Sequence, residues 1–161
     1  MNKIGMNKFA CLAALALLGG TTACKKVETA KLDESVAAKA SDDMLATALS
    51  GDIAKVDGMY AKDDIVAVDA VAADLATSSD QMHKFNEGFL SLKFDKMSYT
   101  ERKIQVLDGE DFIVTAKVHA ESSTGPIKAT DFRLTDVFRK QSDGSFKIVN
   151  EHISMPQPAP K

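Results

Sequence analysis

The clearest alternation of apolar and polar positions lies between residues 130 and 154. In its first part every second residue belongs to one mostly apolar set, which is Thr130, Phe132, Leu134, Asp136 and Phe138. The segment Gln141-Ser142-Asp143-Gly144 then predicts a turn, because Asp-Gly favours a tight reversal of the chain. Alternation resumes over residues 146–154. The stretch therefore predicts two antiparallel strands, with the apolar set turned toward a core or a pocket.

Asp136 is the exception on this apolar face. A charged carboxylate is costly to bury among Phe and Leu side chains. We therefore expect Asp136 to be either a hydrogen-bonded structural residue or a functional group.

A second alternation, over residues 112–120, predicts another strand. Ser123-Thr124-Gly125 fits a three-residue hairpin loop with Gly125 in the left-handed region, which would place Ser122 opposite Pro126. In that register the apolar set of this strand shares one face with the apolar set above; its members are Phe112, Val114, Ala116, Val118 and Ala120. Residues 93–107 predict one more strand before a turn at Asp108-Gly109. Its register stays open, because one register gives better pairing and another a better apolar face.

The N-terminal half predicts helices. Over residues 32–49 apolar side chains recur every three or four positions, which is typical of an amphipathic helix, and Ser50-Gly51 ends it. Asp52 can cap a short second helix. Residues 65–68 predict a short strand that ends at Asp69. Ser78 and Gln81 form a capping-box pattern before a third helix, whose apolar face is Met82, Phe85 and Phe89.

Helices followed by a meandering antiparallel sheet predict one α+β domain over residues 32–154, with the curved sheet folded over the helices and a conical pocket between them. The length of 161 residues allows one domain with a core. The net charge of −3 and the lack of a basic stripe argue against a nucleic-acid partner. The three His residues show no metal-ligand spacing and no nucleophilic triad is visible, so we expect neither a metal nor a cofactor.

Residues 1–23 have the pattern of a signal peptide, with two Lys residues before a short apolar run. Met6 repeats the Met-Asn-Lys of Met1, so the true start is open. The run ends in Gly-Gly-Thr-Thr-Ala-Cys24, which resembles a bacterial lipobox with Thr21 where Leu is usual; ordinary cleavage near Ala23 is the alternative. We expect lipidation of Cys24, a tether over residues 24–31, and a periplasm-facing position in the bacterial envelope. Lys25 favours the outer membrane. The Pro-rich residues 155–161 are expected to be disordered.

Two segments carry a family resemblance: GDIAKVDGMYAKDDIVAVD, which ends at Asp69, and DVFRKQSDGSFKIVNEHIS, which begins at Asp136. Together they resemble the SnoaL-like and ketosteroid-isomerase-like proteins of the nuclear-transport-factor-like superfamily, which are cone-shaped (cystatin-like) α+β barrels. The resemblance implies Asp69 as a general base and Asp136 as a protonated donor to an oxyanion. It departs at Met44, where the isomerases carry a Tyr that also donates to the oxyanion. A turn residue is the alternative role for Asp69.

The superfamily hosts both enzymes and binding modules, so three functions remain open. The first is binding of a small apolar molecule, and the second is an isomerase, cyclase or dehydratase that removes a proton next to a carbonyl. The third is a dimerisation module that pairs through Ile113, Thr115, Arg133, Thr135 and Val137. Glu151 is expected either to reach the pocket, as the family pattern implies, or to be a charge at its rim. The expected pocket residues are Met44, Met59, Tyr60, Phe85, Phe89, Val114, Ala116, Phe132, Leu134, Phe138 and Glu151.

Overall fold

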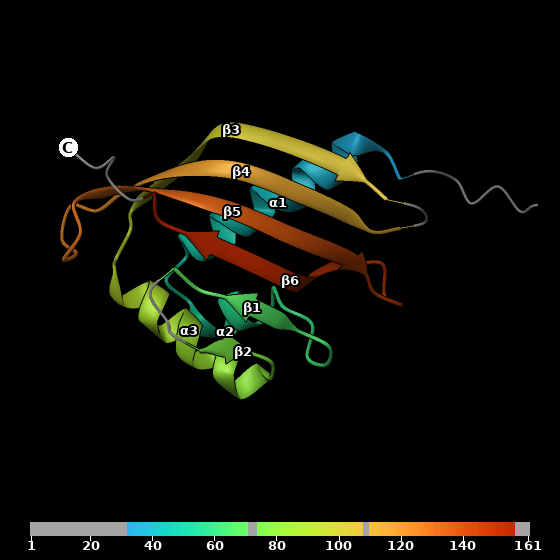
Figure 1. Ribbon diagram of the computed structural model, residues 1–161, viewed down its shortest axis with the longest axis horizontal. Coiled ribbons are helices and arrows are strands. Elements are labelled where there is room, and N and C mark those ends of the chain that lie inside the picture. The colour runs from blue at the N-terminus through green and yellow to red at the C-terminus, as the bar shows by residue number, and fades with distance from the viewer. Residues whose placement is uncertain (1–31, 71–73, 108–109, 157–161) are drawn as a thin grey trace, which may run out of the picture.

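A single curved sheet organises the molecule. The structure, a computed structural model, describes residues 32–70, 74–107 and 110–156. In this part of the chain six strands follow the order β2-β1-β6-β5-β4-β3, with α1 behind the long strands and α2 and α3 gathered beside β1 and β2 (Figure 1). The predicted α+β class is confirmed. The elements are α1 Glu34–Ala48, α2 Ile53–Asp57, β1 Val66–Val68, β2 Leu75–Ala76, α3 Ser79–Ser91, β3 Lys96–Val106, β4 Phe112–Glu121, β5 Ala129–Lys140 and β6 Phe146–Ser154.

The predicted helix boundaries are confirmed. The Asp52 side chain accepts hydrogen bonds from the first backbone N–H groups of α2, and the Ser78 side chain accepts one from Gln81 at the start of α3. Gly51 ends the first helical segment with a φ of +69°, which a residue with a side chain adopts less readily. None of the helices within the described ranges has the length and apolar character needed to cross a membrane.

β4 and β5 share the predicted inner face, but their register differs from the prediction. Val114 lies opposite Asp136, two residues further along β5 than a Ser122–Pro126 pairing would place it. The loop is longer than three residues, because the Ser122 N–H donates to the Lys128 carbonyl across the strand ends. A shift of two residues leaves the same side chains facing inward, so the predicted apolar face is correct although the predicted register is wrong.

Gly125 serves a close approach, not a left-handed turn. Its φ is not positive, and a Cβ there would lie 1.9 Å from the Leu92 carbonyl oxygen. The loop is fastened at this point, since the Ser122 hydroxyl accepts from the Gly125 N–H at 2.7 Å and donates to the Lys93 carbonyl at 2.5 Å. The extra loop length therefore lets the β4–β5 connection contact and hydrogen-bond the segment that follows α3.

β1 joins the sheet by parallel pairing with β6, and this pairing brings the middle of the chain to its end. Ala67 lies opposite Glu151 and Val68 opposite His152. Just before β1, the Ala61 N–H donates to the Ile148 carbonyl and the Ile148 N–H donates to the Met59 carbonyl, both at 2.9 Å. Residues 59–69 are thus held along β6.

Several expectations lie outside the described residues: the leader, Cys24 and the tether to residue 31, the turn at Asp108-Gly109, and the tail beyond residue 156. Met155, which was assigned to the tail, is half-buried and packs against the core. The five residues suggested as a dimer surface all lie on the outer face of the sheet, where Thr115 and Arg133 are exposed and the others half-buried.

Candidate functional site

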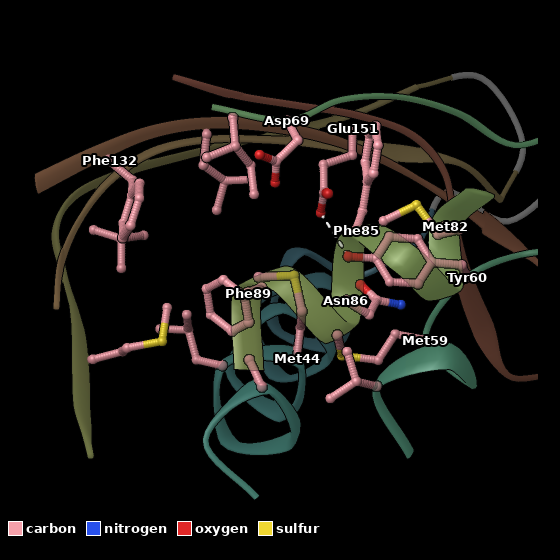
Figure 2. Close-up of a pocket in the computed structure, with 17 residues that line it drawn as sticks. Met44, Met59, Tyr60, Asp69, Met82, Phe85, Asn86, Phe89, Phe132 and Glu151 are labelled. Carbon is pink, nitrogen blue, oxygen red and sulfur yellow. Dashed lines mark hydrogen bonds between the residues drawn. The ribbon is translucent and has the colours of Figure 1, made fainter. Parts of the chain in front are cut away.

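A cavity lies between the inner face of the sheet and the helices. It has a volume of about 60 Å³, so it holds a few waters or a compact ligand. Figure 2 shows helical side chains such as Phe89 and Met44 on one side and Asp69 and Glu151 projecting from the sheet side. The lining is mostly Met, Phe and aliphatic side chains, and its polar members are Tyr60, Asp69, Asn86 and Glu151.

Tyr60 and Glu151 form the best-defined polar contact of the cavity. The Tyr60 hydroxyl donates to Glu151 Oε2 at 3.0 Å, and both side chains are buried (Figure 2). The backbone pairing of residues 59–61 with Ile148 holds Tyr60 beside β6, and period two along β6 turns Glu151 inward. Glu151 is only 5% exposed, so the expectation of a rim charge was wrong.

Asp69 reaches the cavity from the end of β1. Ala67 is fully buried opposite Glu151, and Asp69 follows two residues later on the same side of the chain. Its half-buried carboxyl group points into the cavity beside Glu151 (Figure 2). The parallel β1–β6 pairing therefore brings together two acids that are 82 positions apart in the sequence.

Asp136 is buried behind this polar group, outside the cavity lining. It lies opposite Glu151 on β5, with Val114 on its other side, and it is 0% exposed. Neither carboxyl oxygen has a hydrogen-bond partner among the residues that the structure describes. The alternative of a hydrogen-bonded structural Asp therefore does not hold within those residues, and the structure does not place Asp136 where it would touch a ligand.

Burial controls the proton affinity of this group of side chains. Burial raises the pKa of Glu151 to about 7; the hydrogen bond from Tyr60 opposes this rise and the negative charge of Asp69 adds to it. Burial, with the charge of Glu151, raises the pKa of Asp136 well above its usual range. Burial and the same acids raise the pKa of Tyr60 well above 10. These shifts favour the neutral, protonated forms of Tyr60 and Asp136, while Glu151 is partly protonated near neutral pH.

The cavity brings most of the predicted pocket residues together. Its lining includes Met44, Met59, Tyr60, Phe85, Phe89, Phe132, Leu134 and Glu151, together with Asp69. Val114, Ala116 and Phe138 are buried but do not line it. Phe138 stacks on Phe112 at 4.6 Å between ring centroids, and this packing fills the inner face toward that end of β4 and β5. The space remains toward Phe132 and Val118.

Other lining residues were not predicted as pocket residues, and helical spacing could have found some of them. Met82 and Asn86 fall on the α3 stripe that Phe85 and Phe89 define. Asn86 is 3% exposed, and its side-chain amide donates to Asp57 Oδ1 at 2.8 Å, which satisfies a polar group on an apolar stripe. The remaining unpredicted residues are Leu45, Ala48, Val56, Met97, Val118 and Ile153. Within the described ranges, no group of three or more His, Cys, Asp or Glu side chains could hold a metal ion.

Comparison with the sequence profiles of known protein families identifies the family of this chain. The sequence profile of the SnoaL-like domain matches residues 38–158. The chain belongs to the SnoaL-like domain family. No curated protein matches the sequence significantly. The predicted family resemblance is therefore confirmed at the level of the domain.

Solved structures similar to this SnoaL-like domain are named for different activities. One is a provisionally assigned calcium/calmodulin-dependent protein kinase II association domain from Xanthomonas campestris, with 26% identity, a TM-score of 0.68, and coverage of 81% of this chain and 92% of that one. A ketosteroid isomerase-like protein from Erwinia carotovora atroseptica has 20% identity, a TM-score of 0.64, and coverage of 79% and 100%. The epoxide hydrolase/cyclase-like enzyme SalBIII, of pyran ring formation in the polyether salinomycin, has 14% identity, a TM-score of 0.56, and coverage of 78% and 94%. These likenesses establish the nuclear-transport-factor-like fold and leave the activity to the site.

Proposed function

We propose that this SnoaL-like domain binds a small, mostly apolar molecule in the cavity between the sheet and the helices. The observation that carries the proposal is the composition of the lining: apolar side chains surround the space, while Tyr60, Asp69, Asn86 and Glu151 supply a few polar atoms. Binding sites for small molecules have this character, in which apolar contact gives affinity and a few polar groups fix orientation.

The methionines give a direct test. Met44, Met59, Met82 and Met97 line the cavity, whereas Met155 packs against the core elsewhere. Carbon-13 labelling of the Met methyl groups, with each signal assigned by a Met→Leu variant, would report on all five positions. We expect small alcohols, ketones or amines to shift the four lining signals and to leave Met155 unchanged. Equal shifts at Met155, or no shifts with any compound class, would contradict the proposal.

A second candidate is acid–base catalysis next to a carbonyl group. The observation that favours it is the Glu151 carboxyl, whose pKa of about 7 suits proton transfer near neutral pH and which faces the same cavity as Asp69. In this scheme Asp69 removes a proton from the carbon beside the carbonyl, and protonated Glu151, next to Tyr60, donates a hydrogen bond to the developing oxyanion. Glu151 takes the role that the family resemblance gave to Asp136.

Asp69→Asn separates the two candidates. If the domain is an enzyme, the variant should lose deuterium exchange of acidic C–H positions in small ketones, followed by proton NMR. If the domain only binds, wild type and variant should show the same background exchange. A matched control is Asp63→Asn, which changes an exposed acid of the same segment.

We also propose that Cys24 is lipidated and holds the domain in the bacterial envelope, facing the periplasm. The support is the sequence alone: a short apolar run after two Lys residues, with Cys24 directly behind Ala23. Homodimerisation through the outer face of the sheet is a further proposal. Sedimentation of the purified protein tests it, and a monomer at all concentrations would contradict it.

A further inference from the structure

The charged side chains that line the cavity are all of one sign. Asp69 and Glu151 are acids, and the described lining contains no Lys, Arg or His. Arg102, which lies opposite the inward-facing Ala116, is engaged elsewhere, since its Nη1 donates to Ser41 Oγ at 2.8 Å and to Asp42 Oδ1 at 2.5 Å. The cavity therefore presents a negative end inside an apolar enclosure.

Glu151 retains acceptor capacity toward the cavity. A carboxylate can accept about four hydrogen bonds, and Glu151 receives one at 3.0 Å from the neutral Tyr60 hydroxyl. A buried carboxylate is stabilised far more by a cation than by a neutral donor. At 5% exposure, Glu151 receives little of this compensation from solvent.

We propose that the ligand is a small apolar amine that binds as its protonated cation, with the ammonium group between Glu151 and Asp69 and the alkyl body against the Met and Phe side chains. This inference rests on the proposed binding function and names its ligand class. A ketone oxygen gains at most one hydrogen bond from protonated Glu151 and is repelled by the Asp69 carboxylate, while an anion is repelled by both acids. A cation is attracted by both acids, Glu151 and Asp69. The space of about 60 Å³ sets the size at about five non-hydrogen atoms before the lining rearranges.

The groups that face Glu151 determine the pH dependence. They are Tyr60, Asp69 across the β1–β6 pair, and Asp136 on β5; the α1 and α3 side chains that complete the lining carry no charge. An alkylamine keeps its proton up to about pH 10, as Lys does. Glu151, whose pKa is about 7, is partly protonated near neutral pH, so binding of the cation should release that proton. Affinity should then rise about tenfold between about pH 6 and about pH 8, because the ionised fraction of Glu151 rises by that factor.

The test is a size-matched series of butylamine, butanol, butanone and propionate, titrated into the purified protein and followed by the Met methyl signals. We expect butylamine to bind at least tenfold more tightly than the other three at about pH 8, with the pH dependence given above. Glu151→Gln should lower amine affinity about tenfold and remove its pH dependence. Glu101→Gln, an exposed acid on β3, should leave both unchanged.

Each other outcome has one meaning. If butanol, butanone or propionate binds as well as butylamine, the amine inference is overturned and the binding function stands. If none of the four binds, both are overturned. Because wild-type protein alone gives the ligand ranking and the pH profile, the result does not depend on the folding of the Gln variant.

Discussion

Asp136 and Glu151 lie directly opposite each other on β5 and β6, both buried, and together they place two carboxyl groups inside the sheet. Such a pair is stable when it carries at most one negative charge, because burial penalises each ionised form and the two charges repel. The pair thus links the stability of the fold to the protonation of the cavity.

Stability should fall as the pH rises. The folded protein raises the pKa of Glu151 from 4.5 to about 7, and an acid with a raised folded pKa stabilises the fold in its protonated form. That contribution is complete below 4.5 and is lost as the pH passes through about 7. Urea unfolding should therefore show a loss on the order of 3 kcal/mol between about pH 5 and about pH 8 from this residue. In Glu151→Gln the slope should flatten; an unchanged slope would contradict the assignment.

Tyr60→Phe should raise the pKa of Glu151 above about 7, because the hydrogen bond from Tyr60 lowers that pKa in the folded protein. The variant should also lose about 1 kcal/mol of unfolding free energy at neutral pH. Carbon-13 NMR of the Glu carboxyls measures the pKa, with Glu151→Gln for assignment. Tyr99→Phe is the matched control, since the Tyr99 hydroxyl donates to the Ser41 carbonyl instead. A fall in the pKa of Glu151 would refute the argument.

Asp136→Val should stabilise the protein by about 1–3 kcal/mol, because it removes a buried carboxyl whose oxygens have no partner among the described residues. Val also suits a strand. Asp131→Val on the outer face of the same strand loses an exposed pair with His119 and should cost at most about 1 kcal/mol. Thermal unfolding of both variants is the measurement. A large loss in Asp136→Val would mean that ordered water or another group satisfies the carboxyl.

Gly125→Ala should destabilise the domain by about 3 kcal/mol or more, since the new Cβ would meet the Leu92 carbonyl oxygen at 1.9 Å and the loop would have to detach. Gly88→Ala is the opposite case. Apart from its chain neighbours and the backbone of its own helix, no atom lies within 4 Å of its Cβ position in α3, so this change should stabilise by about 0.5–1 kcal/mol. Urea midpoints of the two variants should move in opposite directions. An unchanged urea midpoint in Gly125→Ala would show that the loop is not fastened there.

Cys24→Ser should release the protein from membranes, because a single Cys would carry the lipid. Expressed in a bacterium with its leader intact, wild type should sediment with membranes and partition into detergent, while the variant should be found in the soluble periplasmic fraction. Cys11→Ser, within the leader, is the control and should behave as wild type. Equal fractionation of wild type and Cys24→Ser would exclude the anchor.

The faces of the strands could be predicted from sequence because alternation is a local property. The register in which the strands pair was harder to predict, because it depends on contacts between distant segments. The register of residues 93–107, which the sequence left open, changes within the strand: Tyr99 pairs with Val118, and after an irregularity Glu101 pairs with Lys117. This bulge at Thr100 changes which residues face inward, so no single register could satisfy the whole strand. The predicted length of the β4–β5 loop was wrong for a similar reason, because the loop is fitted to a tertiary contact of Gly125 with Leu92.

The site was predictable only in part. Helical and strand periodicity predicted most of the apolar lining, because the spacing of apolar residues indicates which face of an element is buried. The role of Glu151 could not be derived this way, since its burial and its bond to Tyr60 depend on the parallel pairing of β1 with β6. Nothing local to residues 146–154 indicates which strand will lie beside them.

That pairing also sets the order in which the molecule can be built. The helices, the β1–β2 pair and the β3–β4–β5 meander form from neighbouring segments, but β1 can join the long strands only through β6, more than 80 residues later. During synthesis the acidic end of the cavity is therefore assembled last, when the C-terminal strand has left the ribosome. Until then the edge of β1 that faces β6 is unpaired, and a chain shortened before Phe146 would lack Glu151 and Ile153 of the cavity lining.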